Sequence, residues 1–161
     1  MNAVVEWFLN HPQFPPQAAV TLISMFPVLE LRAGIPLARL AKLTLGEAIF
    51  FSVIGNIIPI PFILLFIRRI FDWLRPTRAF GGIVRRLEER AMNKSEGIAR
   101  AEFLGLVAFV GIPLPGTGGW TGALIASLLH VDIRKASAAI LLGIAVAATI
   151  MSLVSYGVFH M

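Results

Sequence analysis

The sequence predicts an all-α integral membrane protein in which two re-entrant helical hairpins, each followed by a transmembrane helix, form an inverted pseudo-repeat. Hydrophobic residues make up 57% of the 161 residues and charged residues only 14%, whereas soluble domains usually carry about 25% charged residues. Two apolar stretches are long enough to cross a bilayer, which takes about 20 residues. Two other apolar stretches are interrupted by proline and glycine, which break helices.

The residue types exclude several classes of function. The chain has no cysteine, which rules out a disulfide framework and a thiolate metal site. Its three histidines, His11, His130 and His160, are too scattered to form a ligand set. No phosphate-binding loop, zincin motif or nucleophile elbow is present, so we expect no enzymatic activity, no cofactor and no metal. The first ten residues lack the basic start of a signal peptide, so we expect no cleavage.

From the N-terminus, residues 1–16 are predicted to form an interfacial helix that ends in a proline-rich break. Residues 17–43 form the first hairpin, because their apolar pieces are too short to cross a membrane. Residues 44–67 form the first transmembrane helix. Thr44 and Glu47 match a capping box at its start, and Pro59 and Pro61 should kink its second half.

Residues 68–102 are a basic segment with nine lysine and arginine residues against four acidic residues up to Arg100. A basic segment beside apolar spans stays in the cytoplasm, which predicts a multi-pass membrane protein with this segment on the cytoplasmic side. We expect the membrane to be a prokaryotic cytoplasmic membrane. Phe80, Val84, Leu87 and Ala91 recur near helical spacing, so an amphipathic helix is expected here. Its basic face would contact anionic membrane lipids rather than nucleic acid.

Residues 103–130 form the second hairpin, which is interrupted by the run Gly111-Ile-Pro-Leu-Pro-Gly-Thr-Gly-Gly119. Residues 131–158 contain the last transmembrane helix, with Asp132 as its cap. Small residues at Ala139, Gly143 and Ala147 form a helix-packing stripe. With so few spans, we expect a homodimer, with small-residue faces supplying the contact.

The two halves of the chain resemble each other. The turn at Pro27 recurs at Pro113, 86 residues later, and each half reads as short helix, turn, short helix and span. If both hairpins return to the side they entered, they enter from opposite sides and meet near the midplane, as in transporters with broken helices. The alternative is that both segments cross as kinked helices. The predicted turn or hinge residues are Pro27, Gly34, Pro36, Pro113 and Pro115.

Glu30 and Arg32 are the strongest candidates for function. Ionised groups inside a bilayer are costly unless paired or hydrated, so they usually have a functional role. Burial favours the protonated form of a carboxyl group, which suits a proton carrier. The alternatives are a structural Glu30–Arg32 pair that pins the turn, or an interfacial position in water. Arg39 follows on the returning arm of the same hairpin.

The glycine-rich turn of the second hairpin is a candidate anion site. Free backbone N–H groups at the start of a helix bind phosphate or carboxylate, although glycines could instead simply let two hairpins cross closely. Asn56, in the first span, is expected to make a structural hydrogen bond to a hairpin carbonyl. The predicted transport site comprises Glu30, Arg32, Arg39, Gly116, Thr117, Gly118, Gly119 and Trp120.

At Glu30-Leu-Arg-Ala-Gly-Ile-Pro-Leu-Ala38 and at the glycine-rich run that continues through Trp120-Thr-Gly122, the chain resembles the small multidrug export protein family. That family looks distantly related to the DedA membrane proteins. The resemblance implies two re-entrant hairpins in inverted pseudo-symmetry. It also implies proton-dependent transport or return of a polyprenyl phosphate lipid, with Glu30 as the counterpart of acidic residues in the DedA first hairpin. Arginines of the DedA second hairpin have no counterpart around Pro113.

Three functions follow as expectations. The first is a proton- or ion-linked translocase of an anionic lipid phosphate, because two arginines accompany one glutamate. The second is a drug/proton antiporter that exports cationic lipophilic compounds, with protons or monovalent cations as the coupling ion. The third is a membrane scaffold that transports nothing.

Overall fold

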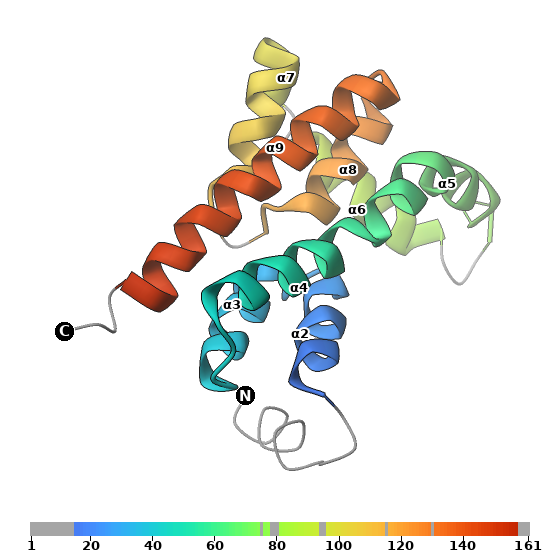
Figure 1. Ribbon diagram of the computed structural model, residues 1–161. Coiled ribbons are helices and arrows are strands. Elements are labelled where there is room, and N and C mark those ends of the chain that lie inside the picture. The colour runs from blue at the N-terminus through green and yellow to red at the C-terminus, as the bar shows by residue number, and fades with distance from the viewer. Residues whose placement is uncertain are drawn as a thin grey trace.

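The computed structural model describes residues 15–74, 76–77, 81–93, 96–114, 116–129 and 131–157. These residues form helices and turns without a strand (Figure 1). The predicted interfacial helix, apart from its last two residues, lies outside the described residues. In chain order the elements are α2 (Pro16–Met25), α3 (Glu30–Leu40), α4 (Leu45–Ile57), α5 (Pro59–Leu74), α6 (Gly81–Asn93), α7 (Glu96–Gly111), α8 (Gly119–Leu128), α9 (Ile133–Ser152) and the π-helical turn η1 (Leu153–Gly157).

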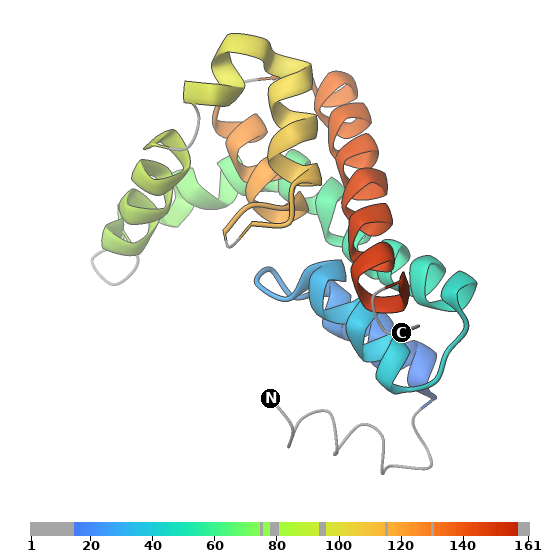
Figure 2. The ribbon, with the colours of Figure 1, turned by 90° about the vertical axis from the view of Figure 1, so that its left-hand side faces the viewer.

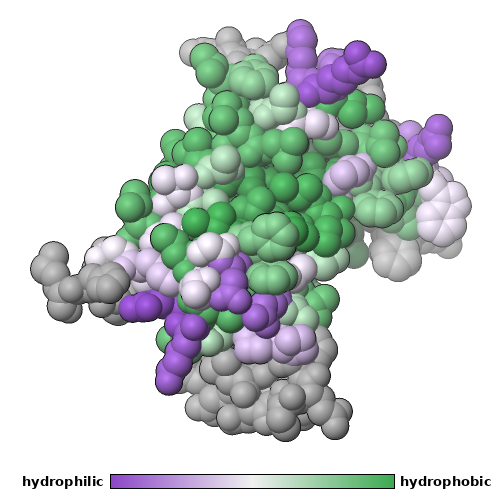
Figure 3. Space-filling model, in the orientation of Figure 1, coloured by the Kyte–Doolittle hydropathy of each residue, from purple (hydrophilic) through white to green (hydrophobic). Residues whose placement is uncertain are grey.

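Two helical stretches are long and apolar enough to cross a membrane, and both match the predicted spans. The first is Leu45–Ile67, made of α4 and most of α5, and the second is Ile133–Gly157, made of α9 and η1. The regular pattern of the first is interrupted at Ile58, directly before Pro59, since proline lacks the N–H that continues a helix. Figure 3 shows an apolar band over this face of the molecule, between polar patches at its ends.

The predicted helix caps are present at the start of both spans. The hydroxyl of Thr44 accepts a hydrogen bond from the N–H of Glu47 at 3.3 Å, and the Thr44 N–H donates to the Glu47 carboxylate at 2.9 Å. The Asp132 carboxylate accepts from the N–H groups of Arg134 and Lys135. Side-chain oxygens satisfy N–H groups that have no partner within the helix, so the sequence fixes both helix starts locally.

The first hairpin consists of α2 and α3, joined by a turn at residues 26–29. Helix α2 ends where Phe26 becomes extended, as expected for the residue before a proline. Helix α3 starts at Glu30, whose φ of 48° is in the left-handed region. Gly34 and Pro36 lie inside α3 rather than in a turn. Gly34 serves close packing instead, because a Cβ atom there would lie 2.8 Å from the Ser52 hydroxyl of α4.

The second hairpin consists of α7 and α8, and α7 begins at Glu96, before the predicted boundary at residue 103. Helix α7 packs closely on α9: a Cβ atom on Gly143 would lie 2.6 Å from the Cβ atom of Val110. Ala139 and Ala147, on the same stripe of α9, are buried. The predicted packing stripe is therefore confirmed, but α7 of the same chain occupies it around Gly143. The expected homodimer, with small-residue faces as its contact, stays a prediction.

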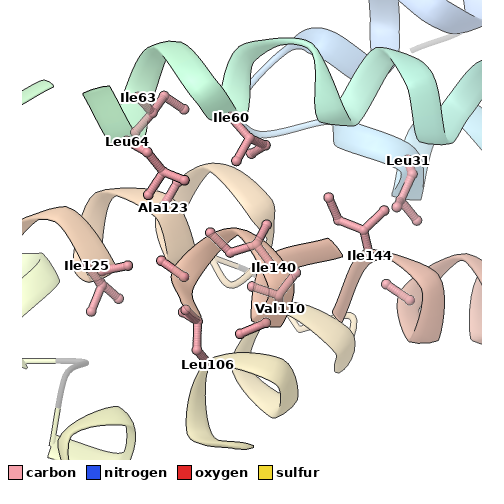
Figure 4. Packing of buried hydrophobic residues seen from close by; sticks show 14 of the residues in the cluster. Leu31, Ile60, Ile63, Leu64, Leu106, Val110, Ala123, Ile125, Ile140 and Ile144 are labelled. Carbon is pink, nitrogen blue, oxygen red and sulfur yellow. The ribbon is translucent and has the colours of Figure 1, made fainter. Parts of the chain in front are cut away.

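The two hairpins approach each other turn to turn from opposite ends of the molecule (Figure 2). A large apolar cluster joins α5, α7, α8 and α9, with Leu31 and Ile35 of α3 added to it (Figure 4). A smaller cluster, which includes Val20 and Leu37, holds α2, α3 and α4 together. Helix α6 forms where the amphipathic helix was predicted, and its Val84 is buried. The two turns thus lie where the large and the small apolar cluster meet.

Candidate functional site

The Glu30 carboxylate connects the two hairpins. It accepts a hydrogen bond from the N–H of Gly119 at 3.2 Å and another from the N–H of Trp120 at 3.0 Å. These N–H groups belong to the first turn of α8, where no partner within the helix exists and where the helix dipole favours a negative charge. Only 3% of Glu30 is exposed. A buried carboxylate of one hairpin therefore caps a helix of the other.

Gly118 makes this contact possible in two ways. It occupies the cap position of α8 with a φ of 127° and has no side chain that could bind the free N–H groups itself. A Cβ atom at this position would lie 2.3 Å from one carboxylate oxygen of Glu30. Residues other than glycine rarely adopt this backbone conformation. Glycine at 118 thus leaves both the backbone freedom and the space that Glu30 needs.

The half-buried Arg32 reaches the turn of the second hairpin. Its guanidinium donates to the carbonyl oxygens of Leu114 and Ile112, which follow α7, and to the hydroxyl of Thr117 at 2.8 Å. These carbonyls lie in the turn after α7 and also accept bonds within it, from the N–H groups of Leu114 and Thr117. Arg32 therefore binds the turn of the second hairpin, beside the helix start that Glu30 caps.

Thr117 organises the turn that Arg32 binds. Its hydroxyl lies 2.9 Å from the carbonyl oxygen of Ile112 and 2.8 Å from that of Leu114, and it can donate to either. It also accepts from the N–H of Leu114 at 3.3 Å. Gly116, with a φ of 77°, provides the left-handed residue of this turn. The predicted glycine-rich turn is thus closed by a threonine.

Trp120 of the second hairpin donates a hydrogen bond to the first hairpin. Its indole N–H donates to the carbonyl oxygen of Met25, the last residue of α2, at 3.1 Å. Each hairpin therefore supplies a donor from its second helix to a carbonyl at the end of the other hairpin's first helix. We refer to the contacts of Glu30, Arg32, Thr117, Gly119 and Trp120 as the turn–turn contact.

Most of the predicted site residues belong to the turn–turn contact or adjoin it, but Arg39 does not. Arg39 is exposed, and its guanidinium lies over the ring of Tyr156 at 5.1 Å. Nine residues of helix separate it from Glu30, a rise of about 13 Å, which explains the distance. Pro27 and Pro113 lie in the two turns as predicted, whereas Pro115 is outside the described residues.

Asn56 does not make the hydrogen bond predicted for it. The residue is 1% exposed, and neither its amide oxygen nor its amide nitrogen has a hydrogen-bond partner among the described residues. The hydroxyl groups of Ser24 and Ser52 are buried in the same unpartnered state. The sequence did not lead us to predict that these three residues form a group. The spacing of Ser52 and Asn56, one helical turn apart in an otherwise apolar span, could have indicated that they share a face.

Two helices that are long and apolar enough to cross a membrane indicate a helical membrane protein. A family model described as putative small multi-drug export protein matches residues 30–150, about three quarters of the chain. The chain belongs to this family, as the sequence resemblance predicted. No curated protein and no solved structure gives a significant match.

Proposed function

We propose that this protein is a proton-linked membrane exporter of lipophilic cationic compounds, in which Glu30 is the switch. The observation that carries the proposal is the Glu30 carboxylate, buried and held by two backbone N–H groups of the opposite hairpin. A buried ionisable group between broken helices is where transporters bind substrates and coupling ions. The family description supports export of drugs.

In this proposal both hairpins are re-entrant and enter the membrane from opposite sides. Helices α2 and α8 each have 10 residues, a length of about 15 Å, whereas the hydrocarbon core is about 30 Å thick. Their turn-to-turn approach supports a meeting point inside the bilayer (Figure 2). The inverted repeat and a cytoplasmic position of residues 68–102 belong to the same proposal.

Protonation of Glu30 would weaken the turn–turn contact. A charged carboxylate forms hydrogen bonds about twice as strong as a neutral acceptor does, and only the charged form gains from the dipole of α8. A proton on Glu30 therefore loosens the start of α8 and lets the hairpins separate. A cationic compound and a proton then compete for the same carboxylate, which is the requirement for exchange transport.

A second candidate substrate is an anionic lipid phosphate. The N–H groups at the start of α8 and the guanidinium of Arg32 are donors of the kind that bind phosphate. In the structure these donors already bind Glu30 and backbone carbonyls. A phosphate could therefore bind only after Glu30 leaves, and the family description names drugs, so we rank this substrate second.

Reconstitution into liposomes separates the two candidates. We expect a proton gradient to drive ethidium transport by the wild-type protein and Glu30→Gln to abolish it, because glutamine keeps the size and removes the charge. Glu89→Gln is the matched control, since Glu89 is exposed on α6. Unchanged ethidium flux in Glu30→Gln would refute the role of Glu30. Flux of a fluorescent polyprenyl phosphate without ethidium flux would select the second substrate, and flux of neither would support the scaffold.

A further inference from the structure

Several buried polar side-chain atoms near the turn–turn contact have no hydrogen-bond partner among the described residues. Among the described residues, five buried side-chain atoms have no partner, and four of them belong to Ser24, Ser52 and Asn56. Buried polar atoms normally have partners, because leaving one unpaired is unfavourable, and inside a membrane no bulk water can replace the partner. Asn56 lies beside the Glu30 contact with Gly119, and the two serines lie around Gly34, one helical turn after Glu30 on α3.

Asn56 is the member of this group that lies against Glu30 and α8. A Cβ atom placed on Gly119 would lie 3.1 Å from the amide oxygen of Asn56. The Asn56 side chain also lies close to the Glu30 carboxyl, although the two do not have the geometry of a hydrogen bond. Among the described residues, Arg32 is the charged residue that interacts electrostatically with the same carboxyl. Its donors are directed to the second turn.

The chemistry of a protonated carboxyl explains why an acceptor is needed there. Both oxygens of Glu30 currently face N–H groups, which donate and cannot accept. A protonated carboxyl carries an O–H group that requires an acceptor. Neither N–H group can serve, and the guanidinium of Arg32 has no acceptor either. The amide oxygen of Asn56 can accept this bond, and it has no other partner.

We propose that Asn56 is the positioning residue that receives the protonated Glu30 side chain, so that the carboxyl alternates between the N–H groups of α8 and the amide of α4. This inference rests on the proposed proton-linked function. Protonation then moves the Glu30 carboxyl from the N–H groups of α8 to the Asn56 amide in the first span. A change of protonation state thereby becomes a change in which helix Glu30 contacts.

The two serines extend this second state. Ser52 lies one helical turn before Asn56 on α4, and Ser24 lies on α2, with Gly34 of α3 between them: a Cβ atom on Gly34 would lie 2.0 Å from the Ser24 hydroxyl and 2.8 Å from that of Ser52. Helices α2, α3 and α4 all contact one another here. The two hydroxyl groups therefore lie at the helix contacts that a shift of α3 would change.

Infrared difference spectroscopy tests the inference directly. The spectrum of the reconstituted protein at acidic minus neutral pH contains the C=O band of the protonated Glu30 carboxyl, which Glu30→Gln removes and so identifies. In Asn56→Leu, which has a similar shape and no acceptor, we expect this band at higher wavenumber, because the O–H group loses its partner. Asn56→Val is the alternative if the leucine variant does not fold. Ser127→Ala, a buried hydroxyl on α8, is the matched control and should leave the band unchanged.

The outcomes separate this inference from the proposed function. A band at the wild-type position in a folded Asn56→Leu or Asn56→Val protein would overturn the role of Asn56, even if ethidium flux still depends on Glu30. Ethidium flux that survives Glu30→Gln would instead overturn the proposed function, whatever the band does. A shifted band together with slower proton-driven ethidium flux in the Asn56 variant would support both.

Discussion

Replacing Gly118 with alanine should open the turn–turn contact. The φ of 127° is unfavourable for any residue with a side chain, and the new Cβ atom would lie 2.3 Å from a carboxylate oxygen of Glu30. Backbone strain of this kind costs about 1–3 kcal/mol. If Glu30 moves aside to relieve the clash, it also loses hydrogen bonds, each worth about 1.5–3 kcal/mol because one partner is charged. We therefore expect Gly118→Ala to lower the free energy of unfolding by about 4 kcal/mol.

Thermal unfolding in detergent measures this change, which corresponds to about 10 °C in Tm for a chain of this length. Gly46→Ala is the matched control, because no atom lies within 4 Å of a Cβ built at that position. Alanine there should be neutral or stabilising by up to about 1 kcal/mol, since glycine is unfavourable inside a helix. Equal Tm values for the two variants would refute the proposed geometry around Gly118.

Two further predictions concern the packing of the hairpins. Trp120→Phe keeps an aromatic side chain, although a smaller one, and removes the donor to the Met25 carbonyl, so stability should fall by at least about 1–2 kcal/mol in denaturant unfolding. Gly143→Ala places a Cβ atom 2.6 Å from that of Val110 and should destabilise by about 1–3 kcal/mol through overpacking. In the same assay Gly157→Ala, which meets no atom within 4 Å, should cost far less.

Either of these two measurements could contradict the structure. A tryptophan variant as stable as the wild type would mean that the indole bond contributes nothing. If Gly143→Ala and Gly157→Ala behave alike, α7 does not pack against α9 as closely as described.

The sequence predicted the local features of the fold well. Both spans and their caps at Thr44 and Asp132 follow from hydropathy and from residues near each helix start, which need no knowledge of the rest of the chain. The two turns were also placed correctly, because Pro27 and Pro113 end helices by their own chemistry. The start of α7 was missed, because residues 96–102 mix charge with helix-forming residues.

The candidate site was predicted less completely, for a reason that lies in tertiary structure. Glu30 and the glycine-rich turn were proposed as parts of one site, yet nothing in the sequence states that the glutamate caps α8 directly. Arg39 was grouped with Arg32 because of its charge, whereas the helix carries it away to Tyr156. Asn56 was expected to have a partner, and its lack of one depends on how three helices meet.

Apart from the bond between Arg32 and the Thr117 hydroxyl, every bond between the two hairpins in the turn–turn contact ends on a backbone group at the end of a helix or in the turn beside it: Met25 of α2, Ile112 and Leu114 after α7, and Gly119 and Trp120 of α8. Separating the hairpins would therefore remove the partners of the α8 N–H groups and of the Met25 carbonyl together, whereas the carbonyls of Ile112 and Leu114 keep the bonds of their own turn. Partial opening gains nothing, because the α8 N–H groups and the Met25 carbonyl still lack a replacement. Such an arrangement favours two discrete states over a gradual series, so single-molecule distance measurements across the turns should record abrupt jumps.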